Sequence, residues 1–176
     1  LKELIETVDT VAITGDLSVL INKVEVDSRL IGEGDLFVAI TGEKDDGIKY
    51  IPNAVAKGAA AVVAERDFTA RTACKVIVKD MRSAVAKIAA RYHKYPSKQL
   101  RLIGVTGTNG KTTITFLLKS ILENRGKPVG VIGTLCYFTG QHSFEAINTT
   151  PGPIELERLL TIMTGEHLRY AVMEVS

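Results

Sequence analysis

The chain has 176 residues, of which 45% are hydrophobic and 24% are charged, and its formal net charge is +2. This composition is typical of a globular protein with room for one large or two small domains, and it excludes a disordered chain. Acidic and basic residues are interspersed, so nothing indicates nucleic acid or an anionic membrane as a partner. No apolar run is long enough to span a bilayer and no signal-peptide pattern opens the chain, so we expect a cytoplasmic protein.

The first half of the chain predicts a small α/β unit. A short helical pattern at residues 4–8 precedes strand-like runs at 11–14, 19–26 and 35–40. A helix at 50–59, strands at 60–64 and 75–79, and a helix at 81–92 with Asp80 as its N-cap follow. Pro96 and the polar residues around it mark a boundary, so we expect a first domain at residues 1–98 and a second at 99–176.

The second half repeats strand and helix. It predicts a strand at 102–106, a helix at 111–125 ended by Gly126, a strand at 128–134 and a hairpin at 135–147. A rigid turn at 148–153 leads to another helix and to a final strand at 170–175. This alternation predicts an α/β fold with a mainly parallel sheet, whose ligands bind beyond the carboxyl ends of the strands. The loop at 107–113, the turn at 148–150 and Glu174 should therefore lie on one rim.

The sequence GTNGKTT at 107–113 predicts a phosphate-binding loop between an apolar strand and a helix. Glycines let the backbone turn with its N–H groups toward an anion, and the first helical turn favours phosphate. Lys111 would reach the β- and γ-phosphates, and the hydroxyl of Thr112 would ligate Mg²⁺. Val105 departs from the strict motif, which has a small residue there. The ordinary alternative is a glycine-rich turn with an exposed lysine.

The two cysteines, Cys74 and Cys136, lack CxxC spacing, and the three histidines form no cluster. We expect reduced thiols rather than a disulfide or a zinc site.

Several short motifs together resemble the Mur ligase family along the whole chain. They are DSR at 27–29, GDLFVA at 34–39, DG at 46–47, AAAVV at 59–63, GTNGKTT at 107–113, NTTP at 148–151 and MEVS at 173–176. The resemblance is greatest to the branch that adds the third amino acid of the peptidoglycan stem peptide. Ile48 departs from the pattern, since the family commonly has histidine after the DG pair.

The resemblance implies ATP-driven amide formation through an acyl phosphate, with ATP and Mg²⁺ as cofactors. The substrates would be UDP-N-acetylmuramoyl-L-alanyl-D-glutamate and either diaminopimelate or L-lysine, and the protein would be a monomer. Lys111, Thr112 and Glu174 would be catalytic, and the last two would hold the metal. The residues expected to bind ATP are Gly107, Thr108, Asn109, Gly110, Lys111, Thr112 and Thr113. Those expected to bind the UDP-linked substrate are Val26, Ser28, Glu43, Lys44, Asp45, Asn148, Thr149, Thr150 and Ser176.

The chain opens on Leu1 and stops at Ser176, directly after an apolar run, so we expect a fragment that does not ligate by itself. A carbamylated lysine and the C-terminal domain of the family would lie beyond Ser176. Alternatives are a D-alanyl-D-alanine-adding ligase, a folylpolyglutamate synthase, a non-catalytic UDP-sugar or nucleotide-binding relative, and a generic phosphate-loop ATPase.

Overall fold

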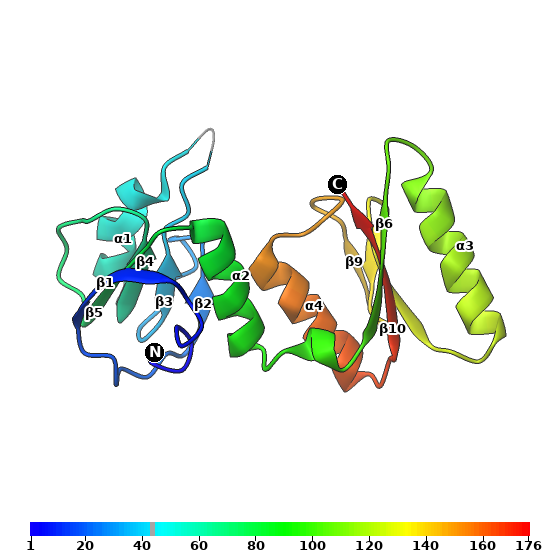
Figure 1. Ribbon diagram of the computed structural model, residues 1–176, viewed down its shortest axis with the longest axis horizontal. Coiled ribbons are helices and arrows are strands. Elements are labelled where there is room, and N and C mark those ends of the chain that lie inside the picture. The colour runs from blue at the N-terminus through cyan, green and yellow to red at the C-terminus, as the bar shows by residue number, and fades with distance from the viewer. Residues whose placement is uncertain (43–44) are drawn as a thin grey trace. The chain divides into compact units, whose positions relative to one another are not determined.

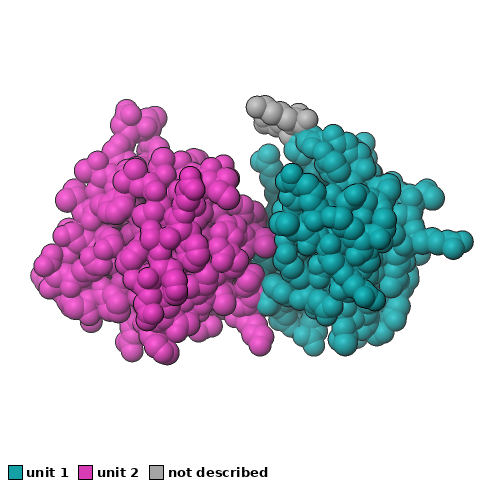
Figure 2. All heavy atoms as spheres, turned by 180° about the vertical axis from the view of Figure 1, so that it is seen from behind, with its two compact units in different colours: residues 1–92 teal, residues 93–176 magenta. Residues whose placement is uncertain are grey.

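The computed structural model describes residues 1–42 and 45–176. They form two compact units, Leu1–Tyr92 and His93–Ser176, which Figure 2 shows in separate colours. In the described part of the chain, no helix combines the length and the apolar character needed to cross a membrane.

The first unit is built on a sheet with the strand order β1-β5-β4-β3-β2. β1 is antiparallel to β5, and the other neighbours are parallel, so the sheet is mixed. The strands are β1 (Thr10–Gly15), β2 (Val24–Glu25), β3 (Leu36–Val38), β4 (Ala61–Ala64) and β5 (Cys74–Val78). A 3-10 turn, η1 (Gly47–Tyr50), leads into α1 (Ile51–Ala56), and α2 (Met81–Tyr92) ends the unit.

The strands and helices of this unit form where their apolar residues can be buried. Every residue of β3 and β4 is buried, as expected of central parallel strands. Phe37 and Val62 pack with Ile51 of α1 in one core cluster. The helix α2 has the predicted bounds, and the Asp80 carboxylate accepts a hydrogen bond from Ser83 N at 3.1 Å, which confirms the predicted N-cap.

Two local predictions in the first unit were wrong. Residues 2–7 form consecutive turns instead of a helix, with Ile5 and Val8 buried. A single helical turn fixes several backbone angles for very few hydrogen bonds. A segment this short therefore does not form a stable helix. The predicted strand at 19–26 is also reduced to Val24–Glu25, which pairs only with β3 at the edge of the sheet.

The second unit carries a sheet with the order β6-β10-β7-β8-β9. β6, β10 and β7 are parallel, whereas β8 and β9 form an antiparallel hairpin beside β7. The strands are β6 (Arg101–Thr106), β7 (Val129–Ile132), β8 (Cys136–Phe138), β9 (Ser143–Glu145) and β10 (Tyr170–Val175), and the helices are η2 (Pro96–Lys98), α3 (Lys111–Asn124) and α4 (Pro153–Gly165). The predicted α/β class and the predicted hairpin are confirmed.

The helices α3 and α4 cover opposite faces of this sheet (Figure 1). Successive residues of β10 alternate accordingly, because Ala171 joins the cluster beneath α4 and Val172 joins the cluster beneath α3. On α3, Leu118 and Leu122 pack on the sheet. A second apolar row on α3, formed by Ile114, Leu117 and Ile121, is 46–60% exposed.

Candidate functional site

The loop between β6 and α3 has the backbone geometry of an anion cradle. Gly110 is the N-cap of α3 and has φ 77°, a left-handed conformation that glycine adopts without strain. Ile114 N donates to Gly110 O at 2.9 Å, so the helix begins directly after this residue. Lys111 and Thr112 therefore occupy the first turn, where the helix dipole and the unpaired backbone N–H groups favour an anion.

A cavity of about 360 Å³ opens at this helix terminus. The side chain of Lys111 lies across the loop, with Nζ donating to Gly107 O at 2.9 Å. The cavity is lined by Thr108, Asn109, Gly110, Lys111, Thr112, Thr113, Thr134, Thr149, Glu174 and Ser176. Residues predicted from three separate stretches of sequence thus meet in one place.

Glu174 is the one carboxylate among the residues that line this cavity. It lies near the carboxyl end of β10 and is 1% exposed. The Thr112 hydroxyl lies 3.0 Å from both of its oxygens, and Thr134 N donates to Oε1 at 3.0 Å. The Thr134 hydroxyl donates to Oε2 at 3.2 Å. A buried carboxylate next to a threonine hydroxyl is a set of hard oxygen donors.

The turn at 148–150 is fixed to the same rim. Thr150 Oγ1 donates to Glu174 O at 2.9 Å and accepts from Ser176 N at 3.0 Å. The Tyr137 hydroxyl donates to Asn148 O at 2.6 Å and lies 3.1 Å from Asn148 N. Gly107, Asn148 and Thr150 do not line the cavity themselves, and the hydrogen bonds of Asn148 and Thr150 tie the turn to β8 and to the end of β10.

Thr134 was missed by the sequence reasoning. It follows β7, and the rule that placed Glu174 on the rim, ligand groups beyond the carboxyl ends of parallel strands, also applies to it. The predicted strand at 128–134 included this residue, and none of the motifs found in the sequence covers it.

The first unit has its own cavity of about 440 Å³, lined by Val26, Asp27, Ser28, Arg29, Asp45 and Tyr50. The predicted residues Val26, Ser28 and Asp45 therefore come together. Glu43 and Lys44 lie outside the described residues. The Tyr50 hydroxyl donates to Asp45 Oδ2 at 2.7 Å. Asp27, Arg29 and Tyr50 were not predicted as site residues.

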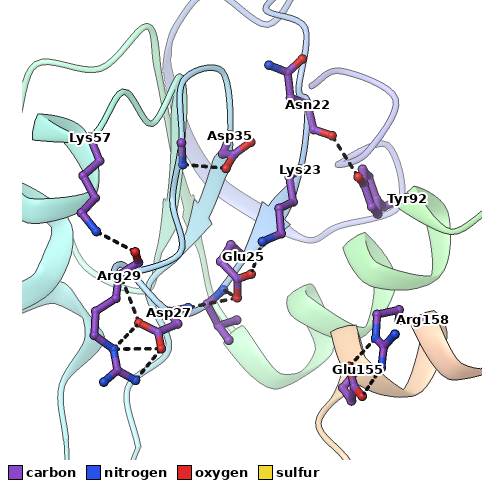
Figure 3. Close-up of polar contacts among 12 residues, drawn as sticks. Asn22, Lys23, Glu25, Asp27, Arg29, Asp35, Lys57, Tyr92, Glu155 and Arg158 are labelled. Carbon is purple, nitrogen blue, oxygen red and sulfur yellow. Dashed lines mark hydrogen bonds and ion pairs between the residues drawn. The ribbon is translucent and has the colours of Figure 1, made fainter. Parts of the chain in front are cut away.

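Asp27 and Arg29 form an ion pair in this cavity, which Asp45 also lines (Figure 3 shows the pair). Arg29 Nε donates to Asp27 Oδ1 at 2.9 Å and Nη2 donates to Oδ2 at 2.6 Å. This bidentate pair, together with the backbone N–H of Arg29, lowers the pKa of Asp27 to about 2. Lys57 Nζ donates to Arg29 O at 2.6 Å and fixes the loop backbone. Ile48, the departure from the family pattern, packs against the core of the unit.

The fold and the loop at 107–113 define an α/β protein with a glycine-rich, phosphate-binding type of loop. Comparison with known proteins specifies the class further. Residues 20–93 match the model described as Mur ligase family, catalytic domain, and residues 105–176 match the Mur ligase middle domain. The chain belongs to the Mur ligase family.

Its relatives include two proteins named UDP-N-acetylmuramoyl-L-alanyl-D-glutamate--2,6-diaminopimelate ligase. The one from Alkaliphilus metalliredigens is 41% identical over 177 residues, covering 100% of this chain and 36% of the relative. The one from Clostridium botulinum is 45% identical over 160 residues, covering 89% of this chain and 33% of the relative. The chain thus spans about a third of the length of these curated relatives.

Solved structures agree with the family. A structure titled with the same diaminopimelate ligase name matches with a TM-score of 0.72 and 25% identity, covering 89% of this chain and 32% of that one. A D-alanyl-D-alanyl ligase from Acinetobacter baumannii matches with a TM-score of 0.57 and 29% identity, covering 88% of this chain and 31% of that one.

Proposed function

We propose that this chain supplies the nucleotide site and the uridine diphosphate site of an ATP-dependent ligase in peptidoglycan synthesis. The ligase adds 2,6-diaminopimelate to UDP-N-acetylmuramoyl-L-alanyl-D-glutamate. The observation that carries the proposal is the meeting of Lys111, Thr112 and Glu174 in one cavity at the N-terminus of α3. The names of the relatives favour diaminopimelate over L-lysine as the added amino acid.

The residues of the cavity fit Mg²⁺. Magnesium prefers oxygen ligands and usually keeps several waters, with one or two protein groups and substrate phosphates completing its octahedron. Thr112 points its proton at Glu174, which leaves the lone pairs of the hydroxyl for a cation. The described residues contain no group of three or more His, Cys, Asp or Glu that could hold a metal without such phosphates. When bound, the cation would offset negative charge on the triphosphate.

In a reaction of this class the substrate carboxylate attacks the γ-phosphorus of ATP and releases ADP, which gives an acyl phosphate. The incoming amine then displaces inorganic phosphate and loses a proton, which leaves an amide. The Lys111 ammonium and the first turn of α3 would stabilise charge on the transferred group. The hydroxyls of Thr149 and Ser176 would hold oxygen atoms of the acceptor substrate, because they bond oxygen without adding charge.

The cavity of the first unit would bind the other end of that substrate. The Ser28 hydroxyl and the Arg29 guanidinium can donate to ribose or diphosphate oxygens, and Tyr50 offers an aromatic face to a base. The cytoplasmic location and the monomeric state remain predictions.

Calorimetric titration tests the proposal on the chain as it stands. We expect binding of both Mg²⁺·ATP and UDP-N-acetylmuramoyl-L-alanyl-D-glutamate. Lys111→Ala should weaken ATP roughly 10- to 100-fold, as expected for a hydrogen bond to a charged group. Ser28→Ala should weaken only the UDP-linked ligand, by roughly 2- to 10-fold. Ser18→Ala is the matched control, because its exposed hydroxyl donates to Asp16 Oδ2 within its own turn.

A folded chain that binds neither ligand would refute the proposal. A second candidate, a D-alanyl-D-alanine-adding ligase, is favoured by the 29% identity to the Acinetobacter baumannii structure. The name of that enzyme describes a substrate that already contains diaminopimelate, so the two candidates differ in the peptide that they accept. Clearly tighter binding of the diaminopimelate-containing UDP-linked tripeptide than of the dipeptide form would favour the second candidate.

A further inference from the structure

The pairing of two neighbouring strands places Thr134 next to Glu174, the carboxylate of the proposed metal site. β7 and β10 are parallel, and Ile132 is paired with Met173. Gly133, which directly follows β7, therefore lies beside Glu174 of β10, and Thr134 comes next on the rim. No sequence motif links these positions, which are 40 residues apart.

The Thr134 contacts have a defined direction. An ionised carboxylate only accepts hydrogen bonds, so both the N–H and the hydroxyl of Thr134 donate to Glu174, at 3.0 Å and 3.2 Å. The hydroxyl has one proton. Its 3.1 Å contact with the Thr149 hydroxyl must then be donated by Thr149, which leaves the Thr134 proton for the carboxylate.

Gly133 shows that the carboxylate approaches this backbone closely. A Cβ at Gly133 would lie 2.3 Å from Glu174 Oε1 and 2.9 Å from Cδ. The carboxylate thus occupies the space that any side chain at this position would need. Thr112 of the phosphate loop holds it from another element, with 3.0 Å contacts to both oxygens.

We propose that Thr134 is a positioning residue that orients the Glu174 carboxylate toward a divalent cation bound with the nucleotide. This inference rests on the proposed function of the site. Thr112 can serve the cation directly, whereas Thr134 acts through Glu174 by fixing its rotamer. The requirement is for the hydroxyl itself, so serine should replace threonine and valine should not.

The test measures Mn²⁺ affinity in the presence of ATP by electron paramagnetic resonance, and ATP affinity without metal by calorimetry. Thr134→Val should weaken Mn²⁺ binding about tenfold or more, the usual effect of losing a group that orients a ligand. Metal-free ATP affinity should not change, which a general loss of structure would not permit. Thr134→Ser should restore Mn²⁺ affinity. Thr164→Val is the matched control, since that hydroxyl lies near the C-terminal end of α4, where it donates to Thr161 O at 2.8 Å.

The outcomes separate the two proposals. Equal Mn²⁺ affinity in the unsubstituted chain and in Thr134→Val would overturn the positioning role alone. Failure of Thr134→Ser to restore affinity would overturn the requirement for the hydroxyl, and with it the inference. Absence of Mn²⁺·ATP binding by the folded, unsubstituted chain would overturn the proposed nucleotide site and the inference together.

Discussion

Adding one methyl group at Gly133 should destabilise the second unit by displacing Glu174. The new Cβ would lie 2.3 Å from Glu174 Oε1 and 3.0 Å from Cγ, so the carboxylate has to move about 1 Å to reach ordinary contact. Glu174 is 1% exposed and held by Thr112 and Thr134, so this movement breaks hydrogen bonds in a buried site. Overpacking of this kind costs about 1–3 kcal/mol.

Amide hydrogen exchange of β10 measures this cost within the second unit alone. Gly133→Ala should speed exchange in β10 by roughly 5- to 150-fold, the conversion of that free energy. Gly165→Ala is the matched control, because nothing lies within 4 Å of a Cβ there and the residue is the last of α4. It should leave exchange unchanged or slow it by up to about fivefold, the equivalent of about 1 kcal/mol. Equal exchange in Gly133→Ala and the unsubstituted chain would refute the argument that Glu174 is rigidly held.

Three further predictions concern stability, followed by urea unfolding with circular dichroism. Leu159→Ala should lower the free energy of unfolding by about 2–5 kcal/mol because Leu159 is fully buried. Leu117→Ala, at a 57% exposed position, should change it by less than about 1 kcal/mol. A larger loss for Leu117→Ala than for Leu159→Ala would contradict the packing of the second unit. Asp80→Ala should cost about 1 kcal/mol by removing the N-cap of α2, and an unchanged midpoint would argue against that cap. Because Arg29 lowers the pKa of Asp27 from 3.8 to about 2, the pair stabilises the fold above pH 4, and this contribution is lost as the pH falls toward 2. Asp27→Asn should remove that part of the pH dependence, worth less than about 1 kcal/mol for so exposed a pair, and identical profiles would refute it.

Much of the second unit could be predicted because its signals are local. The glycines and Lys111 at 107–113, the apolar period of the following helix and Gly126, which follows the C-cap Arg125 with φ 67°, are read from adjacent residues, and α3 begins and ends within one residue of expectation. The residues 4–8 show the limit of such signals. Their apolar spacing is helical, but the segment is too short to hold a helix. Residues 2–7 form turns, and Ile5 and Val8 are still buried.

The pairing of distant strands could not be predicted in the same way. The apolar residues of α3 gave a helix without saying that Leu118 and Leu122 face the sheet while Leu117 is exposed, since that choice depends on which strands lie beneath the helix.

The sequence by itself determined the α/β class, the phosphate-binding type of loop and the family, because periodicity, turn chemistry and motifs depend on residues close together in the chain. The tertiary structure decided that Glu174 lies beside Gly133 and accepts hydrogen bonds from Thr134. That contact exists because β10 enters the sheet between β6 and β7, and strand order is fixed by burial of both faces of the sheet rather than by any local pattern.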